Sequence, residues 1–263
     1  MHKRQPTTIG ILFVTVVLFT VSSLCQEAQT SKLQEEEATI VQKGKVTDEE
    51  RVYSKIYEKE YDFFRDEKIS QMRGTDRLVL EGSFPGSPND LPVRAEIFFN
   101  KLACDADLII RGMVKDKSSH LTEDETFVYT EHKIIVGEII KNNEKALVEV
   151  GSEINVTRPG GVISLDGRIF RVTDKSYESL KTKGQYLLFL KFVPAANGYK
   201  SFNSSSDFSL ADNKFNKLTK RILPKELDFV DSETSLVQLI RNSNMLGCKN
   251  VIGGGFSKFS SVK

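Results

Sequence analysis

Alternating apolar and polar residues, interrupted by closely spaced turns, constrain the fold of this chain more than any other feature. Residues 127–140 form the longest such stretch, in which Val128, His132, Ile134 and Val136 share one face. Several short strands at such spacing predict a barrel or a sandwich with an aliphatic interior. The other segments with strand character are 108–114, 147–150, 153–157, 161–165, 168–173, 185–193, 198–202, 207–210 and 214–218.

Two turn motifs fix local pairing within this region. Pro159-Gly160-Gly161 predicts one turn. Asp166-Gly167 predicts a tighter turn of the kind that joins two antiparallel strands. We therefore expect the segments on either side of residues 166–167 to form a hairpin.

Helical patterns flank the strands on both sides. Thr47 and Glu50 form a capping box that predicts the start of a helix over residues 48–72, and this helix carries one aromatic stripe. The stripe either docks on the strands or binds a partner protein. Shorter helices are expected at residues 93–103 and 232–241.

The amino terminus has the layout of a secretory signal peptide. The positive residues His2, Lys3 and Arg4 precede an apolar run over residues 9–24, and small residues allow cleavage after Cys25. The run is shorter than the roughly 20 residues that span a bilayer, so export is favoured over the alternative of an uncleaved membrane anchor. Membrane contact is expected only through residues 9–24 if cleavage does not occur.

Charge and cysteine content narrow the class of protein further. The chain has 37 basic and 36 acidic residues, and removal of Lys3 and Arg4 with the signal peptide leaves 35 basic residues. This near-neutral balance argues against a nucleic-acid partner. Two cysteines remain, Cys104 and Cys248, and in an oxidising compartment an isolated pair predicts one disulfide.

The histidines do not form a recognisable catalytic or metal site. His120 stands near Glu123, Asp124 and Glu125, but carboxylates crowded in sequence do not converge as zinc ligands, and the spacing of a calcium loop is missing. His132 is expected to be a partly buried strand residue. We therefore predict no metal, no cofactor and no catalytic residues.

Basic and aromatic residues around the predicted hairpin are the nearest approach to a binding surface. Arg158, Arg168, Phe170 and Arg171 fall close together in sequence. Strand faces and loops of small barrels bind oligonucleotides or oligosaccharides through such residues. The alternative is an ordinary solvated hairpin, which the neutral net charge favours.

The segment Cys104-Asp105-Ala106-Asp107-Leu108-Ile109-Ile110-Arg111 resembles the first barrel strand of the tissue inhibitors of metalloproteinases and of the netrin-like modules related to them. The resemblance implies an OB-like five-stranded barrel with flanking helices, and a disulfide from Cys104 to a cysteine beyond the barrel, which Cys248 matches. The segments 158–161 and 184–190 also look like those of a family of exported bacterial proteins of unknown function.

The chain differs from the metalloproteinase inhibitors at the amino-terminal segment that binds the protease. Those proteins chelate the protease zinc with an amino-terminal cysteine directly before the barrel, whereas here any mature terminus lies about 80 residues upstream. The resemblance therefore implies the fold, while an inhibitor-like role remains one alternative.

Together these patterns predict a mainly β protein with flanking helices, built on an OB-like five-stranded barrel with an added N-terminal helix. The expected function is that of a secreted or periplasmic, non-enzymatic protein that binds a protein or a polysaccharide at the cell envelope; the alternative is a hydrolase whose site is assembled from dispersed residues.

The expected parts of the chain are a signal peptide (1–25), a flexible leader (26–46), a helical extension and loop (47–92), the barrel domain (93–248) and a disordered tail (249–263).

Overall fold

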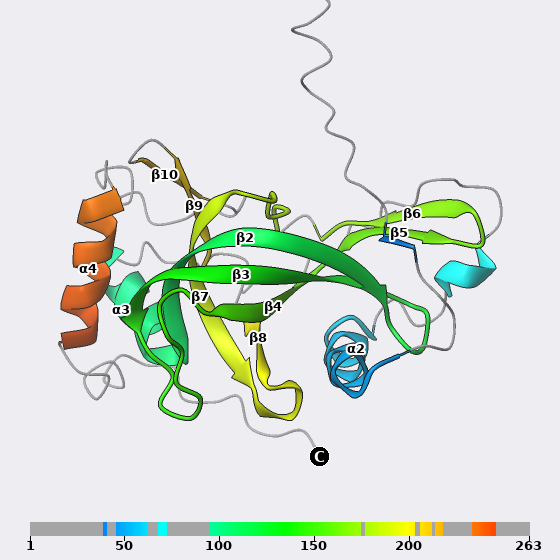
Figure 1. The fold of residues 1–263 in the computed structure, drawn as a ribbon, viewed down its shortest axis with the longest axis horizontal. Coiled ribbons are helices and arrows are strands. Elements are labelled where there is room, and N and C mark those ends of the chain that lie inside the picture. Colours follow the sequence, from blue (N-terminus) through cyan, green and yellow to red (C-terminus); the bar gives the residue numbers. More distant parts are fainter. Residues whose placement is uncertain are drawn as a thin grey trace, which may run out of the picture. The chain divides into compact units, whose positions relative to one another are not determined.

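Strands and a few helices make up the part of the chain that the structure describes (Figure 1). The computed structural model describes residues 39–40, 46–62, 68–72, 95–174, 177–202, 206–211, 214–217 and 233–245. The helices are α2 (Asp48–Glu60), α3 (Ala95–Asp105) and α4 (Glu233–Met245), with short 3-10 turns η2 (Ile69–Gln71) and η3 (Pro194–Ala196). The strands are β1 (Thr39–Ile40), β2 (Leu108–Leu121), β3 (Val128–Lys141), β4 (Glu153–Pro159), β5 (Gly161–Leu165), β6 (Arg168–Val172), β7 (Gln185–Val193), β8 (Gly198–Ser201), β9 (Phe208–Ala211) and β10 (Lys214–Lys217).

Five strands close into a ring. β2 pairs with β3 and β7, β3 pairs with β4, and β8 joins β4 to β7. All of these pairings are antiparallel except the parallel pairing of β4 with β8. Consecutive strands β2, β3 and β4 with β7 beside β2 form a Greek key, and β8 closes it.

A network of side chains joins the end of α3 to the start of β2. Lys141 Nζ donates to the carbonyl oxygens of Ala103 and Ala106, at 2.7 and 2.6 Å, and so satisfies acceptors at the C-terminal end of α3. The Asp107 carboxylate accepts a hydrogen bond from the Phe192 backbone N–H at 3.0 Å and lies 3.3 Å from Lys191 Nζ. These contacts explain why an aspartate stands just before the first ring strand.

Successive residues of the ring strands face alternately inward and outward. All five strands contribute to one buried apolar cluster, so this cluster fills the inside of the ring; it includes Ile110, Ile134, Val156, Leu188 and Tyr199. A second cluster lies outside the ring, where α3 and α4 cover β2, β7 and β9 with Phe99, Leu102, Leu236, Ile240 and their strand partners.

The expectation of a purely aliphatic interior is wrong. His132 lies two residues before Ile134 on β3, and Arg158 lies two residues after Val156 on β4, so both face the interior of the ring. Both are buried. Asp207 is fully buried beside Arg158. One end of the ring therefore holds charged side chains.

A third cluster binds α2 to the far ends of β2 and β3 and to the small sheet β1-β5-β6 (Figure 1). Tyr57 stacks on Tyr129 with ring centroids 5.0 Å apart, and Tyr61 stacks on Phe127 at 3.8 Å. The capping box at Thr47 is present as predicted. The aromatic stripe of α2 thus docks on the strands.

Several expected elements differ in extent. The helix expected over 48–72 ends at Glu60, and a 3-10 turn follows at Ile69–Gln71. Residues 147–150 are a loop, because the strand begins only at Glu153. β2 continues to Leu121, beyond the expected end at residue 114, so His120 lies on this strand. The hairpin β5–β6 is confirmed. The expected signal peptide, residues 73–92 of the expected helical extension and loop, Cys248 and the tail lie outside the described residues.

Candidate functional site

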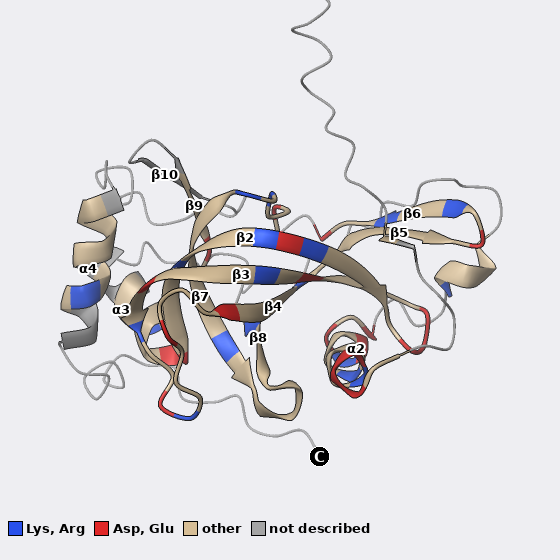
Figure 2. Cartoon of the chain, viewed as in Figure 1, with Lys and Arg blue, Asp and Glu red and all other residues tan. Residues whose placement is uncertain are grey.

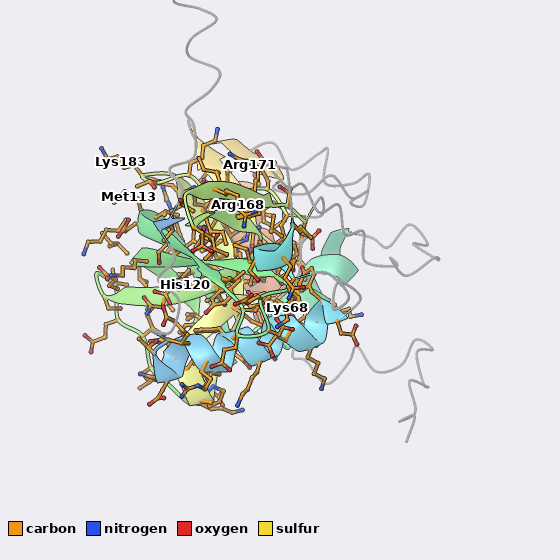
Figure 3. The ribbon with its side chains drawn as sticks, turned by 90° about the vertical axis from the view of Figure 1, so that its right-hand side faces the viewer. Lys68, Met113, His120, Arg168, Arg171 and Lys183 are labelled. Atoms are coloured by element: carbon orange, nitrogen blue, oxygen red, sulfur yellow. The ribbon has the colours of Figure 1, made fainter. Side chains whose placement is uncertain are left out.

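The four hairpin residues singled out in the sequence do not form one surface. Arg158 and Phe170 are buried, at 2% and 0% exposure, so neither can contact a ligand on the surface. Arg168 Nη1 donates to the Met72 carbonyl at 2.6 Å, and its guanidinium lies over the Phe170 ring. Arg171 stands on the opposite face of β6 because it is an odd number of residues from Arg168 (Figure 3). The sequence placed these residues correctly on or beside the hairpin but could not show which way each one faces.

Arg158 belongs to a buried ion pair inside the ring. Its Nη2 lies 3.5 Å from Asp207 Oδ2, and its guanidinium stands 5.2 Å from the centre of the Tyr177 ring. Ser201 Oγ donates to the same carboxylate at 2.5 Å. Burial raises the pKa of Asp207, which Arg158 and the serine oppose. The guanidinium nitrogens make no hydrogen bond to other described residues. The pair is enclosed, with side-chain exposures of 3% for Arg158 and 0% for Asp207.

A second polar arrangement joins β2 to the start of α2. Ser118 Oγ lies 3.0 Å from His120 Nε2, and His120 Nδ1 lies 2.8 Å from Glu50 Oε1. Glu50 is itself held by the Thr47 backbone N–H at 2.6 Å. His120 lies on the side of β2 that faces α2 (Figure 3) and stacks on Tyr129. Burial lowers the pKa of His120 although Glu50 opposes this. A serine, a histidine and a carboxylate in this order match the geometry of an activated nucleophile.

The backbone around Ser118 does not offer what such a nucleophile needs. Acyl transfer requires donors directed at the developing oxyanion. The N–H of Lys117 donates to the Asp116 carboxylate at 2.9 Å, and the N–H of Ser119 donates to Thr39 Oγ1 at 2.8 Å. Both flanking donors are therefore already used. This arrangement fits a link between α2 and β2 better than a catalytic site.

α2 covers the outer face of β3 and β4. Tyr57 Oη donates to Thr157 Oγ1 at 3.2 Å, Asn155 Nδ2 donates to Glu49 Oε1 at 3.3 Å, and Tyr129 Oη donates to the Glu50 carbonyl at 3.1 Å. Burial, with Glu49 and Glu50 nearby, raises the pKa of Glu131 to about 7, and Lys133 opposes the shift. The helix thus covers this face at Tyr129, Asn155 and Thr157, while Glu131 stays partly exposed.

A groove opens beside the covered face. It has a volume of about 430 Å³ and is lined by the β3–β4 loop, the first half of β4 and the β7–β8 hairpin. Leu147, which lines the groove, is 79% exposed, and Val150, in the same loop but outside the lining, is 63% exposed; such exposure is uncommon for large apolar side chains that serve only the core. The lining residues are Ala146, Leu147, Val148, Glu149, Ser152, Glu153, Ile154, Asn155, Phe192, Asn197 and Tyr199.

The groove lies where the ring is incompletely closed. β4 pairs with β3 from Glu153 to Pro159 but with β8 only at Val156 and Thr157. In the described part of the chain, the half of β4 at residues 153–155 therefore has no strand partner on its second edge. An unpaired edge exposes backbone donors and acceptors that another chain can use.

Charged residues are dispersed over the described surface. Figure 2 shows basic and acidic residues alternating along part of β2 and mixed on α2. Within the described ranges, no group of three or more His, Cys, Asp or Glu side chains is placed to hold a metal ion. None of the described helices has the length and apolar character needed to cross a membrane.

Comparison with known proteins assigns no relationship: no protein-family model matches the chain, and no curated protein matches it in sequence.

The groove was missed in the sequence because its apolar signal was interpreted as a strand. Residues 147–150 contain Leu147, Val148 and Val150, a pattern that favours β structure. Only Val148 is buried, and the other two face solvent. The flanking Asn142-Asn143 and Gly151 are turn-forming residues that could have indicated a loop.

Proposed function

We propose that this protein is exported and acts as a non-enzymatic binding protein of the cell envelope, with the groove beside β4 as its binding site for a polypeptide partner. The observation that carries the proposal is the coincidence of an unpaired strand edge with the exposed side chains of Leu147 and Val150. Apolar residues beside free backbone groups suit an extended protein segment. The N-terminal apolar run supports export.

We also propose that the ring is an OB-like barrel. The Greek key of β2, β3, β4 and β7, closed by β8, is the kind of connection expected of a five-stranded, partly open barrel. The seam between β4 and β8 corresponds to the opening. The resemblance at residues 104–111 points to the same fold.

A polypeptide is favoured as the partner over a polysaccharide or a nucleic acid because α2 covers β3 and β4. OB-like barrels bind oligonucleotides and oligosaccharides on the face of their second and third strands. In this protein those strands are β3 and β4, and the α2 tyrosines occupy that face. The near-neutral charge also argues against nucleic acid.

Capture of envelope proteins with variants of the two exposed apolar residues of the β3–β4 loop tests the proposal. The protein without residues 1–25 would be used as bait on its own envelope fraction, beside the variant L147S/V150S. The control is Ile169→Ser, which removes an equally apolar side chain, 47% exposed, from β6. We expect proteins captured by the wild type and by I169S to be lost with L147S/V150S. The same proteins captured by all three baits, or a glycan retained in their place, would contradict it.

A hydrolase is the second candidate, because Ser118, His120 and Glu50 are aligned. A fluorophosphonate probe distinguishes it from a binding protein, since an activated serine is labelled covalently. Labelling of the wild type and of the neighbouring variant S119A, but not of S118A or H120A, would support the hydrolase. No labelling would leave the alignment as a structural link. The inhibitor-like alternative depends on Cys25, which lies outside the described residues.

The disulfide between Cys104 and Cys248 remains a proposal. Supporting it, Cys104 lies near the end of α3, and α4 packs on α3 and ends three residues before Cys248. A bridge closing such a long loop contributes about 5 kcal/mol in the chain-entropy model, less any strain. We expect Cys104→Ser to lower the thermal midpoint of the oxidised protein; an unchanged midpoint would argue against the bridge.

A further inference from the structure

We infer that the groove recognises its partner by strand addition: the partner segment extends β4 along its open edge and presents alternating apolar and basic residues. This inference rests on the proposed binding function and adds the mode of recognition and the chemistry of the segment.

The backbone geometry of the seam leaves one edge of β4 available. β4 and β8 are adjacent at Val156 and Tyr199 and separate before Asn155 pairs. At Gly198, where β8 begins, a Cβ atom would lie 3.5 Å from the Asn155 carbonyl oxygen, an ordinary contact distance, so β8 still borders β4 at this carbonyl and the open edge begins beyond it, at Glu153 and Ile154. Asn197 directly before it is in the left-handed conformation, with φ of 47°, and turns the chain out of the 3-10 turn. An added strand would continue the sheet from that point.

Side chains around this edge match an extended segment with one apolar face. Ile154 and Phe192 are partly buried in the ring cluster, and Tyr199 is buried beside them at 5.3 Å between the Phe192 and Tyr199 ring centroids. Leu147 adds apolar surface from the loop. Alternate side chains of an added strand would point toward this surface, because successive residues of a strand face opposite sides.

The charged residues of the groove determine the sign of the partner's polar side chains. Glu149 and Glu153 are the only charged residues among its lining residues. Glu153 is held by Lys115 on β2 at 2.6 Å, whereas Glu149 is exposed on the loop. A basic side chain near Glu149 would gain electrostatic attraction, and an acidic one would be repelled. The partner segment is therefore basic as well as apolar.

Synthetic peptides test the inference directly. The probes are capped octapeptides of alternating lysine and valine, the same sequence with N-methyl groups on alternate residues, and an alternating glutamate and valine peptide. Binding would be measured by NMR titration, together with hydrogen exchange of the backbone amides at residues 153–155. We expect the lysine peptide to bind, to slow exchange at these amides, and to bind at least about tenfold more tightly than either other peptide.

Charge variants provide the matched controls. Glu149→Lys should reverse the preference between the lysine and glutamate peptides. Glu144→Lys adds the same charge to an exposed position of the same loop, outside the groove lining, and should leave the preference unchanged.

Three outcomes would overturn the inference: no binding of the lysine peptide at about 1 mM, equal binding of the N-methylated peptide, or shifts confined to the β5–β6 hairpin. If the capture of envelope proteins still depends on Leu147 and Val150, only the mode of recognition fails. If L147S/V150S captures the same envelope proteins as the wild type, the proposed function itself fails.

Discussion

The two halves of β4 have opposite surroundings although they belong to one strand. At Val156 and Thr157 the strand has β3 on one edge and β8 on the other, and Tyr57 of α2 covers Thr157. From Glu153 to Asn155 it keeps only β3 among the described strands and borders the groove. The comparison shows that pairing with β8 closes the edge of one half, whereas the edge of the other half stays open, although α2 reaches it through the hydrogen bond from Asn155 to Glu49. Changes to the closed half should therefore cost stability, and changes to the open half should cost binding.

The largest effect is expected from the ion pair in the closed half. Asp207→Ala leaves the buried Arg158 guanidinium without its counter-charge, which should lower the free energy of unfolding by about 3–5 kcal/mol. Urea denaturation at neutral pH measures this. The double variant R158M/D207L removes both charges and should regain most of the loss. A loss below about 1 kcal/mol for D207A would show that the pair is better hydrated than its burial indicates.

Removing the cover of the closed half should cost nearly as much. Tyr57→Ala deletes a fully buried ring that stacks on Tyr129 and Phe127, at an expected cost of about 3–5 kcal/mol. Tyr57→Phe keeps the ring and loses only the hydrogen bond to Thr157, at about 1 kcal/mol. Thermal unfolding of both variants separates packing from the hydroxyl. Equal losses would place the stabilisation in the hydrogen bond instead.

The covered face should also make stability depend on pH through Glu131. Its pKa is raised from 4.5 to about 7 in the folded protein, mainly by burial. The folded state therefore holds the proton more tightly than the unfolded state between about pH 4.5 and 7, and this contribution to stability is lost as the pH rises through that window. Because the side chain is partly exposed, the effect is modest. We expect Glu131→Gln to raise the thermal midpoint by about 2 °C at pH 8 and to leave it unchanged at pH 4.5. A gain at pH 4.5 as large as at pH 8 would exclude titration of Glu131 as the cause.

The smallest effect on stability is expected in the open half. Leu147→Ser and Val150→Ser alter exposed side chains, so each should change the free energy of unfolding by less than about 0.5 kcal/mol. Denaturation of the same preparations used for capture measures this. A larger loss would mean that the loop supports the core, and any loss of binding would then follow from unfolding.

Local signals in the sequence were sufficient for most elements of the fold. The capping box at Thr47, the Asp166-Gly167 turn and the apolar run over 185–193 each lie where the corresponding element begins, turns or extends. Such signals depend on neighbours within a few residues, so they can be recognised without the rest of the chain. The loop at 147–150 was mistaken for a strand because an exposed apolar residue and a buried one are identical in sequence.

The sequence by itself determined that this chain is rich in strands, where its hairpin turns, and that its helices have one apolar side. Only the tertiary structure decided that Arg158 points into the ring toward Asp207, that α2 covers β3 and β4, and that β8 leaves half of β4 unpaired. The physical reason is that strand closure and burial depend on contacts between segments far apart in sequence, here β4 with β8 and α2 with both, whose geometry no local pattern encodes.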